Sequence, residues 1–186
     1  MLRACGCAQS DSVLRSDAVS AGRPRHVLFL CTGNSARSVM AEVLLNALGG
    51  GRYRAFSAGS NPAGAVNPFT IDTLRHHGLP TSGLRSKSWD EFAAPDAPPV
   101  DLVVTVCDNA AGETCPIWPG RPAKVHWGFP DPAAAQGTDA VRRAAFEAGF
   151  GSIRARIEAF CALPSEALGT PAFERALAEL SAAQHP

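Results

Sequence analysis

Short apolar runs alternate with amphipathic helical patterns along most of this chain. The clearest run, residues 101–106, is six residues long and carries three β-branched valines. Runs of this length and composition are typical of buried strands in a parallel sheet. Four such runs occur, at residues 26–30, 53–57, 101–106 and 124–127.

Helical patterns fill the segments between these runs. The pattern that begins at residue 36 keeps its apolar side chains on one stripe and ends at the three glycines 49–51. Further helices are expected from the Asn67 N-cap to Gly78, at a capping box from Ser88 to Glu91, from Thr138 to about Phe160, and after Pro164. Strands that alternate with helices predict βαβ units, and therefore an α/β fold built on a parallel sheet.

The patterns divide the chain into three segments. Residues 1–25 are polar and show no periodicity, which predicts a disordered tail. Residues 26–162 carry the alternating pattern and are expected to form a single domain. Residues 163–186 are expected to form a C-terminal helical extension, because a chain of 186 residues has room for one domain with additions at its ends.

Composition and charge exclude several classes of protein. Hydrophobic residues make up 46% of the chain, so it can bury a core, and its formal net charge is zero. A neutral chain gives no bulk electrostatic reason to bind nucleic acid or an acidic membrane, and neither is expected as a partner. No apolar run approaches the roughly 20 residues of a membrane span, and the N-terminal segment lacks the apolar core of a signal peptide. We therefore expect a cytoplasmic protein.

The chain contains six cysteines, which are Cys5, Cys7, Cys31, Cys107, Cys115 and Cys161. This number is too small for the disulfide framework of a secreted protein of this length. Cysteines of a cytoplasmic protein are usually reduced, and they serve chemistry or metal binding. Cys5 and Cys7 lie in the predicted tail, where they could bind a metal or cycle between redox states, or be two incidental thiols.

Cys31 and Arg37 enclose the segment that is richest in chemical information. Cys31 follows the first predicted strand, and Arg37 opens the next helix after five intervening residues. A loop of this length can point several backbone N–H groups at an anion, and the helix N-terminus adds partial positive charge. The guanidinium of Arg37 can grip two oxygens of a tetrahedral anion. The predicted oxyanion-binding loop consists of Thr32, Gly33, Asn34, Ser35, Ala36, Arg37 and Ser38.

The same surroundings favour a nucleophilic role for Cys31. Positive charge and a helix N-terminus can lower the pKa of a thiol, and Ser38 can donate a hydrogen bond to the sulfur. We expect Gly33 to allow a close turn of the backbone and Asn34 to brace the loop. The alternative is that Cys31 is a buried thiol at a strand end and that Arg37 is a solvated helix residue.

Cys107 and Cys115 suggest a redox function rather than a hydrolytic one. Cys107 follows the clearest strand, so it is expected at the carboxyl edge of the sheet together with the Cys31 loop. Cys115 follows through a loop that contains Gly112. A hydrolase needs only water to release its product, whereas a reductase must move two electrons, for which additional thiols supply a relay. Alternatively, both are structural thiols, or they bind zinc together with His126.

The loop and its flanks resemble the low-molecular-weight protein tyrosine phosphatase superfamily. The resemblance lies in Cys31 to Ser38, in Met40-Ala41-Glu42 and in Ser57-Ala58-Gly59, and it covers roughly residues 26–162. It implies a single-domain four-stranded parallel sheet flanked by helices. It also implies that Asp131, in an Asp-Pro pair, protonates the group that leaves.

Within that superfamily the chain resembles the arsenate reductases, through Cys115-Pro116 and His126-Trp127-Gly128. The resemblance implies that Cys31 attacks arsenate and that Cys107 then attacks Cys31, which releases arsenite and forms a Cys31–Cys107 disulfide. Cys115 next attacks Cys107, and an external dithiol reduces the final disulfide. Thioredoxin or a glutaredoxin/glutathione system is the expected reductant, and no tightly bound cofactor is expected.

Two departures refine this resemblance. The aromatic residues that hold a phenyl ring in the phosphatases are missing, since Gly59 is followed by Ser60 and the Asp-Pro pair by three alanines. A small inorganic anion is therefore the expected substrate, arsenate with phosphate as a competitor. Some of these reductases bind potassium at the positions of Asn34, Glu42 and Ser57, but the completing acidic residue is replaced near Trp89, so no metal is expected.

Two other functions remain open at this stage. The first is a low-molecular-weight tyrosine phosphatase, which the missing aromatic walls and the extra cysteines disfavour. The second is a non-catalytic binding module that responds to arsenic or to redox state. The complete set of Cys31, Arg37 and Asp131 disfavours that second alternative.

Overall fold

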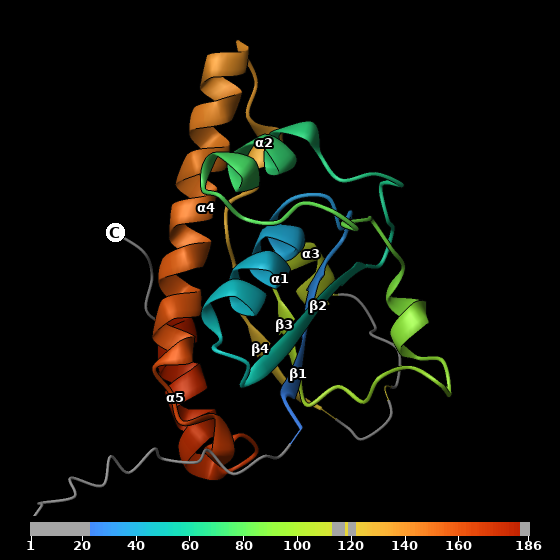
Figure 1. The fold of residues 1–186 in the computed structure, drawn as a ribbon, viewed down its shortest axis with the longest axis vertical. Helices are drawn as coiled ribbons and strands as arrows, with labels where there is room; N and C mark the ends of the chain where they lie inside the picture. Colours follow the sequence, from blue (N-terminus) through green and yellow to red (C-terminus); the bar gives the residue numbers. More distant parts are fainter. Residues whose placement is uncertain (1–22, 113–117, 119–121, 183–186) are drawn as a thin grey trace, which may run out of the picture.

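Four parallel strands form the centre of the molecule (Figure 1). The computed structural model describes residues 23–112, 118 and 122–182. The strands are β1 (Arg25–Cys31), β2 (Tyr53–Gly59), β3 (Leu102–Thr105) and β4 (Ala123–His126). They lie in the order β2-β1-β3-β4, and each neighbouring pair is parallel. The α/β fold with a four-stranded parallel sheet is therefore confirmed.

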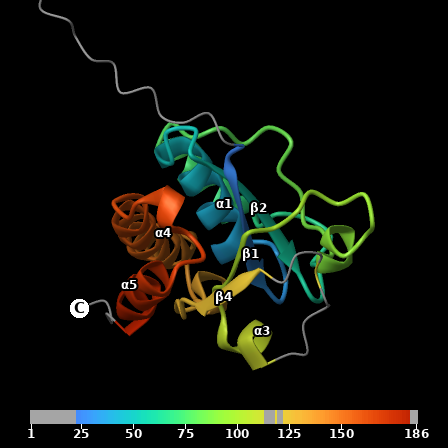
Figure 2. The ribbon, with the colours of Figure 1, turned by 90° about the horizontal axis from the view of Figure 1, so that it is seen from below.

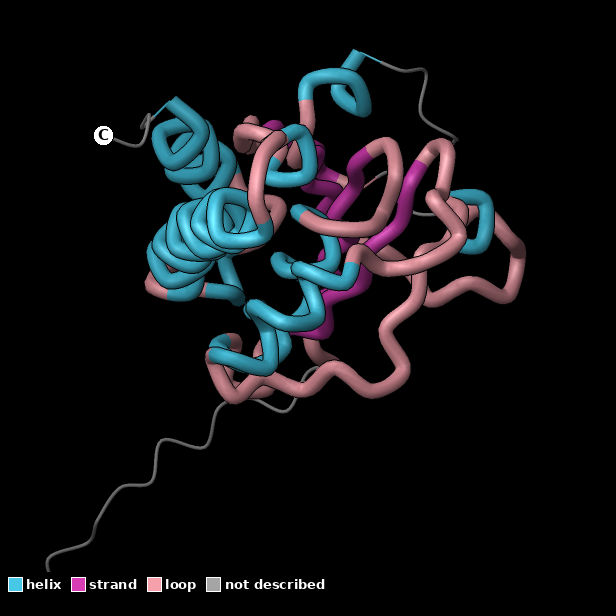
Figure 3. The backbone as a smooth tube through the Cα atoms, turned by 90° about the horizontal axis from the view of Figure 1, so that it is seen from above, coloured by secondary structure: helices cyan, strands magenta, loops and turns pink. Residues whose placement is uncertain are grey.

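Helices cover mainly one face of this sheet, as the two end-on views show (Figures 2 and 3). The α-helices are α1 (Arg37–Leu48), α2 (Pro68–His76), α3 (Asp108–Gly112), α4 (Asp139–Cys161) and α5 (Pro171–Ala182). Three short 3-10 helices accompany them, namely η1 (Trp89–Phe92), η2 (Pro132–Ala134) and η3 (Ser165–Ala167). The predicted strands and helices are thus present, with ends that differ by a few residues, whereas α3 was not predicted.

Strand β1 is buried on both faces because successive side chains point to opposite sides of the sheet. Val27, Phe29 and Cys31 belong to the large core cluster beneath the helices. Leu28 and Leu30 belong to a smaller cluster on the other face, which also contains Phe92 of η1 and Trp118. The central position of β1 brings its C-terminal residue, Cys31, to the middle of the carboxyl edge of the sheet.

Side-chain caps set the starts of several helices. The Asn67 side chain accepts from the Phe69 N–H at 2.9 Å, and Thr138 Oγ1 accepts from the Val141 N–H at 3.4 Å. The predicted capping box at Ser88 is wrong in one respect. Ser88 caps η1, but the Glu91 carboxylate pairs with Arg85 instead of reaching back to the start of the helix. An exposed guanidinium nearby offers that carboxylate a charged partner.

The C-terminal helical extension contributes to the core. Phe173 and Leu177 of α5 are buried in the same cluster as the strands, and Arg156 of α4 donates a hydrogen bond to the Leu180 carbonyl. Cys161, expected in the core, is only partly buried. No helix in the described part of the chain is both long and apolar enough to cross a membrane.

Removal of the Phe173 ring should therefore destabilise the whole domain. We expect Phe173→Ala to lower the free energy of unfolding by about 3–5 kcal/mol, since a large buried ring leaves a cavity. Urea denaturation measures the change, with Val141→Ala as the control, because that side chain is exposed. A loss below about 1 kcal/mol for Phe173→Ala would mean that α5 is only loosely attached.

Candidate active site

The segment between β1 and α1 folds around the sulfur of Cys31. The Asn34 N–H donates to Cys31 Sγ at 3.2 Å, and Ser38 Oγ lies 2.9 Å from the same sulfur. Asn34 Nδ2 donates to Ser38 Oγ at 3.0 Å, which leaves the Ser38 hydroxyl hydrogen free to point at the sulfur. Two donors therefore converge on Cys31, as expected for a nucleophile that reacts as its anion.

Asn34 is the centre of the loop. It is fully buried and has a positive φ of 43°, the left-handed region that Asn tolerates better than most side chains. Its Nδ2 also donates to Ser57 Oγ at 2.9 Å, and its Oδ1 accepts from the Lys87 N–H at 2.8 Å. These contacts on both sides of its amide hold an uncommon backbone conformation in place.

Gly59, rather than Gly33, is the glycine that the loop requires. A Cβ on Gly59 would lie 2.4 Å from the Thr32 carbonyl oxygen, whereas a Cβ on Gly33 would meet nothing closer than 3.6 Å. The prediction that Gly33 provides the close turn is therefore wrong. Asn34 provides the left-handed residue, and Gly59 at the end of β2 allows the loop to approach the sheet.

The state of the Cys31 thiol depends on opposing effects. Burial, with only 3% of the residue exposed, raises the pKa of Cys31, while the hydrogen bonds from Ser38 and Asn34 lower it. Burial is the larger effect, so the pKa lies above its ordinary value. The expectation of a lowered pKa is wrong for this arrangement, in which Arg37 engages groups other than the sulfur.

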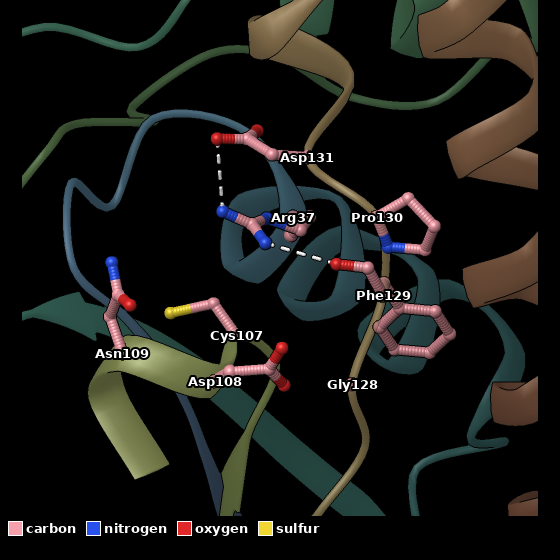
Figure 4. Close-up of a pocket in the computed structure, with 8 residues that line it drawn as sticks. All are labelled: Arg37, Cys107, Asp108, Asn109, Gly128, Phe129, Pro130 and Asp131. Atoms are coloured by element: carbon pink, nitrogen blue, oxygen red, sulfur yellow. Dashed lines mark hydrogen bonds and ion pairs between the residues drawn. The ribbon is translucent and has the colours of Figure 1, made fainter. Parts of the chain in front are cut away.

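Arg37 faces the predicted acid, as the close-up shows (Figure 4). Arg37 Nη2 lies 3.1 Å from Asp131 Oδ2, and Nη1 donates to the Phe129 carbonyl at 3.0 Å. Asp131 Oδ1 in turn accepts from the Ala133 N–H at the start of η2. The guanidinium and the carboxylate, which are far apart in the sequence, are thus in direct contact.

Arg37 and Asp131 line a cavity of about 510 Å³. The lining residues are Arg37, Cys107, Asp108, Asn109, Gly128, Phe129, Pro130 and Asp131. Phe129 is the only aromatic residue among these described lining residues. A polar cavity with an arginine suits a small oxyanion better than a phenyl ester.

Cys107 reaches the same site from β3. It is buried, and its sulfur lies 3.7 Å from Thr32 Oγ1 of the Cys31 loop. The prediction that the ends of β1 and β3 bring these two cysteines to one edge of the sheet agrees with this contact. Cys31 and Cys107 are both free thiols. Cys115, Cys5 and Cys7 lie outside the described residues.

His126 lies within hydrogen-bond distance of two neighbouring side chains. Its Nδ1 lies 2.9 Å from Thr105 Oγ1, and its Nε2 lies 3.1 Å from Asp108 Oδ1. Within residues 23–112, 118 and 122–182, no three His, Cys, Asp or Glu side chains are grouped to hold a metal ion. The described residues therefore offer His126 a structural role between β3, β4 and α3.

An ion pair that the sequence analysis missed lies next to the loop. Lys87 Nζ is 3.5 Å from both Glu42 Oε2 and Ser57 Oγ, and Ser57 Oγ donates a short hydrogen bond to Glu42 Oε2. Glu42 and Ser57 are two of the positions considered for potassium. The ammonium group is therefore the cation that these oxygens contact. A lysine two residues before Trp89 was the available signal.

Loss of the Ser38 hydroxyl should make Cys31 less acidic. The hydrogen bond from Ser38 lowers the pKa of Cys31, so Ser38→Ala should raise it and shift the pH profile of Cys31 alkylation to higher pH. Peptide mass spectrometry after timed iodoacetamide treatment measures the profile, with Ser181→Ala in α5 as the control. A profile that moves to lower pH would show that Ser38 does not stabilise the thiolate.

Comparison with known proteins identifies the family. The sequence profile of the low molecular weight phosphotyrosine protein phosphatases matches residues 26–169. The arsenate reductase of Halalkalibacterium halodurans is 40% identical over 134 residues, which is 72% of this chain and 93% of that protein. The arsenate reductase of Bacillus subtilis is 38% identical over the same shares of the two chains.

Solved structures agree in fold. The arsenate reductase of Archaeoglobus fulgidus is 29% identical with a TM-score of 0.58, covering 74% of this chain and 99% of that one. A thioredoxin-dependent arsenate reductase of Corynebacterium glutamicum is 26% identical with a TM-score of 0.51, covering 73% of this chain and 61% of that one. This chain belongs to the low molecular weight phosphotyrosine protein phosphatase family.

Proposed function

We propose that this chain is an arsenate reductase that converts arsenate to arsenite through a thiol adduct on Cys31. The observation that carries the proposal is the second thiol, Cys107, in contact with Thr32 of the Cys31 loop. A hydrolase of this fold has no use for a thiol at that place, whereas a two-electron reduction requires one. Relatives at about 40% identity that are named arsenate reductases support the same activity. We assign the chemistry to the domain over residues 26–162.

The first step is the formation of a sulfur–arsenic bond. Arsenate binds in the loop of residues 32–38, and the guanidinium of Arg37 turns from Asp131 and the Phe129 carbonyl to two arsenate oxygens. Cys31 attacks arsenic as its thiolate, an As–O bond breaks, and Asp131 donates the proton with which the oxygen leaves as water. The cavity that contains both Arg37 and Asp131 supports these two roles.

The second step transfers the electrons. Cys107 attacks the Cys31 sulfur, the S–As bond breaks with its electron pair on arsenic, and arsenite leaves as a Cys31–Cys107 disulfide forms. Thr32 Oγ1, 3.7 Å from the Cys107 sulfur, is placed to donate a hydrogen bond to the attacking thiolate. The contact between the loop and Cys107 keeps the second nucleophile close to the first.

The last step regenerates the enzyme with an external reductant. We propose that Cys115 attacks Cys107 and carries the disulfide to the surface, where a dithiol protein reduces it. Thioredoxin is the favoured reductant, since the similar C. glutamicum enzyme is thioredoxin-dependent, and a glutaredoxin/glutathione system is the alternative. A cycle of free thiols requires a reducing compartment, which supports a cytoplasmic location.

The competing activity is hydrolysis of phosphotyrosine. The loop, Arg37 and Asp131 would serve both reactions, so weak hydrolysis of an artificial aryl phosphate is compatible with the site. Among the described residues that line the cavity, however, Phe129 is the single aromatic one, and Ser60 follows the Ser-Ala-Gly segment. An aryl ring would lack the stacking partners that a specific phosphatase needs.

Replacement of Cys107 separates the two activities. We expect Cys107→Ser to reduce thioredoxin-coupled arsenate turnover by at least about 100-fold, since the hydroxyl cannot take part in thiol exchange. Its hydrolysis of para-nitrophenyl phosphate should stay within about threefold of the wild type, because that reaction needs only Cys31, Arg37 and Asp131. Arsenate-dependent NADPH oxidation, with thioredoxin and thioredoxin reductase supplied, measures turnover.

Two further variants serve as controls for this experiment. Cys31→Ser should abolish both activities, and Cys115→Ser should accumulate a Cys31–Cys107 disulfide after a single turnover, which peptide mapping detects. If Cys107→Ser turns over at the wild-type rate, the proposed relay is wrong. If it instead loses both activities, Cys107 is needed for the fold of the site.

Replacement of Arg37 tests the two-point grip on the anion. Arg37→Lys keeps the charge but loses the planar fork, so kcat/KM for arsenate should fall by at least about 100-fold. Kinetics with Arg85→Lys, a change in an exposed ion pair, give the baseline. Wild-type kinetics for Arg37→Lys would contradict the two-point grip and would mean that Arg37 only pairs with Asp131.

A further inference from the structure

The ion pair between Lys87 and Glu42 is unusually buried. The exposed fractions of the two side chains are 9% and 17%, and every other ion pair among the described residues has a side chain that is at least 37% exposed. The removal of two charges from water is costly unless they satisfy each other and their neighbours. A shielded pair at this place therefore suggests a functional role, beyond holding two segments of the chain together.

Lys87 contacts the Cys31 loop once directly and once through Ser57 of β2. Its backbone N–H donates to Asn34 Oδ1 at 2.8 Å, and its ammonium lies 3.5 Å from Ser57 Oγ, the group that accepts from Asn34 Nδ2. The Lys87 backbone thus holds the side-chain oxygen of Asn34. Ser57, which lies next to the Lys87 ammonium group, holds the side-chain nitrogen. Asn34 in turn donates its own N–H to the Cys31 sulfur.

Glu42 explains why a cation is needed there. Its carboxylate accepts from Ser57 Oγ, which fixes the direction of the Ser57 hydroxyl and leaves the Ser57 oxygen to accept from Asn34. Without a nearby cation, this shielded carboxylate would carry an uncompensated charge and would move toward solvent. That movement would release Ser57 and then the left-handed turn at Asn34.

We propose that Lys87 is a positioning residue for the reaction, an internal cation that holds Glu42, Ser57 and Asn34 in the arrangement that aims the loop at Cys31. The proposal deepens the proposed function and rests on it for its consequence in turnover. Its direct consequence is the reactivity of Cys31, which can be measured without arsenate. The chain thus supplies from its own sequence the positive charge that stabilises the back of its oxyanion loop.

The test uses Lys87→Met in the full-length protein. We expect the alkylation of Cys31 by iodoacetamide to be at least about fivefold slower at a fixed pH near neutrality, and its pH profile to move to higher pH, because the donors to the sulfur are no longer held. Arsenate turnover should fall in parallel. Arg85→Met is the matched control, since it removes a cation from an exposed ion pair in the same segment, and it should leave both rates unchanged.

The double variant Glu42→Gln/Lys87→Met distinguishes charge compensation from simple packing. A neutral amide at position 42 can still accept from Ser57 but needs no cation, so the double variant should recover Cys31 alkylation to within about threefold of the wild type. Circular dichroism and thermal melting establish that each variant is folded. If Lys87→Met does not fold, the double variant must restore both folding and the alkylation profile.

Two results would overturn the proposal. The first is an alkylation profile of folded Lys87→Met that matches the wild type. The second is a double variant that is no better than Lys87→Met. A wild-type protein that fails to reduce arsenate would count against the proposed function alone, because the alkylation experiment would still report whether Lys87 positions the loop.

Discussion

The left-handed turn at Asn34 is the constraint on which the active site depends. With φ at 43°, this residue directs its own N–H toward Cys31 and its side-chain amide toward Ser38 and Ser57. A side chain of another type in this conformation would be strained and would lack the two donors and the acceptor that Asn uses here. The turn is possible because Gly59 leaves room for the loop to pass close to the end of β2.

The sheet places the reactive groups, and the loop orients them. Residues at the carboxyl ends of parallel strands meet at one edge, so Cys31 at the end of β1 and Cys107 just beyond β3 come to the same edge of the sheet. Orientation comes from side chains that are remote in sequence, such as Ser57 and Lys87. The scaffold and the fine geometry therefore have separate origins. Backbone topology sets the scaffold, and buried polar contacts set the fine geometry.

The sequence predicts the scaffold far better than it predicts the fine geometry of the site. Apolar runs and caps are local signals, and for this reason the four strands, the Asn67 and Thr138 caps and the edge that holds Cys31 and Cys107 could be anticipated. The pairing of Lys87 with Glu42 joins residues 45 positions apart and has no local pattern.

The errors at Gly33 and at the Cys31 thiol have the same cause. Whether a glycine is required depends on what its missing Cβ would meet, and for Gly59 that neighbour is the Thr32 carbonyl of the Cys31 loop, which is remote in sequence. The acidity of a thiol depends on burial, which the packing of the whole core determines.

In the proposed reaction, Arg37 would connect anion binding to proton donation. The guanidinium that would grip the anion is held by the Asp131 carboxylate and by the Phe129 carbonyl. An arriving oxyanion offers the same guanidinium two charged oxygens, so it competes directly with Asp131 for one partner. In the proposed reaction, an anion that wins this competition would free the Asp131 carboxyl group from Arg37 and leave it beside the oxygen that departs. Binding of the substrate and release of the proposed acid would then be a single event, because both depend on the same guanidinium.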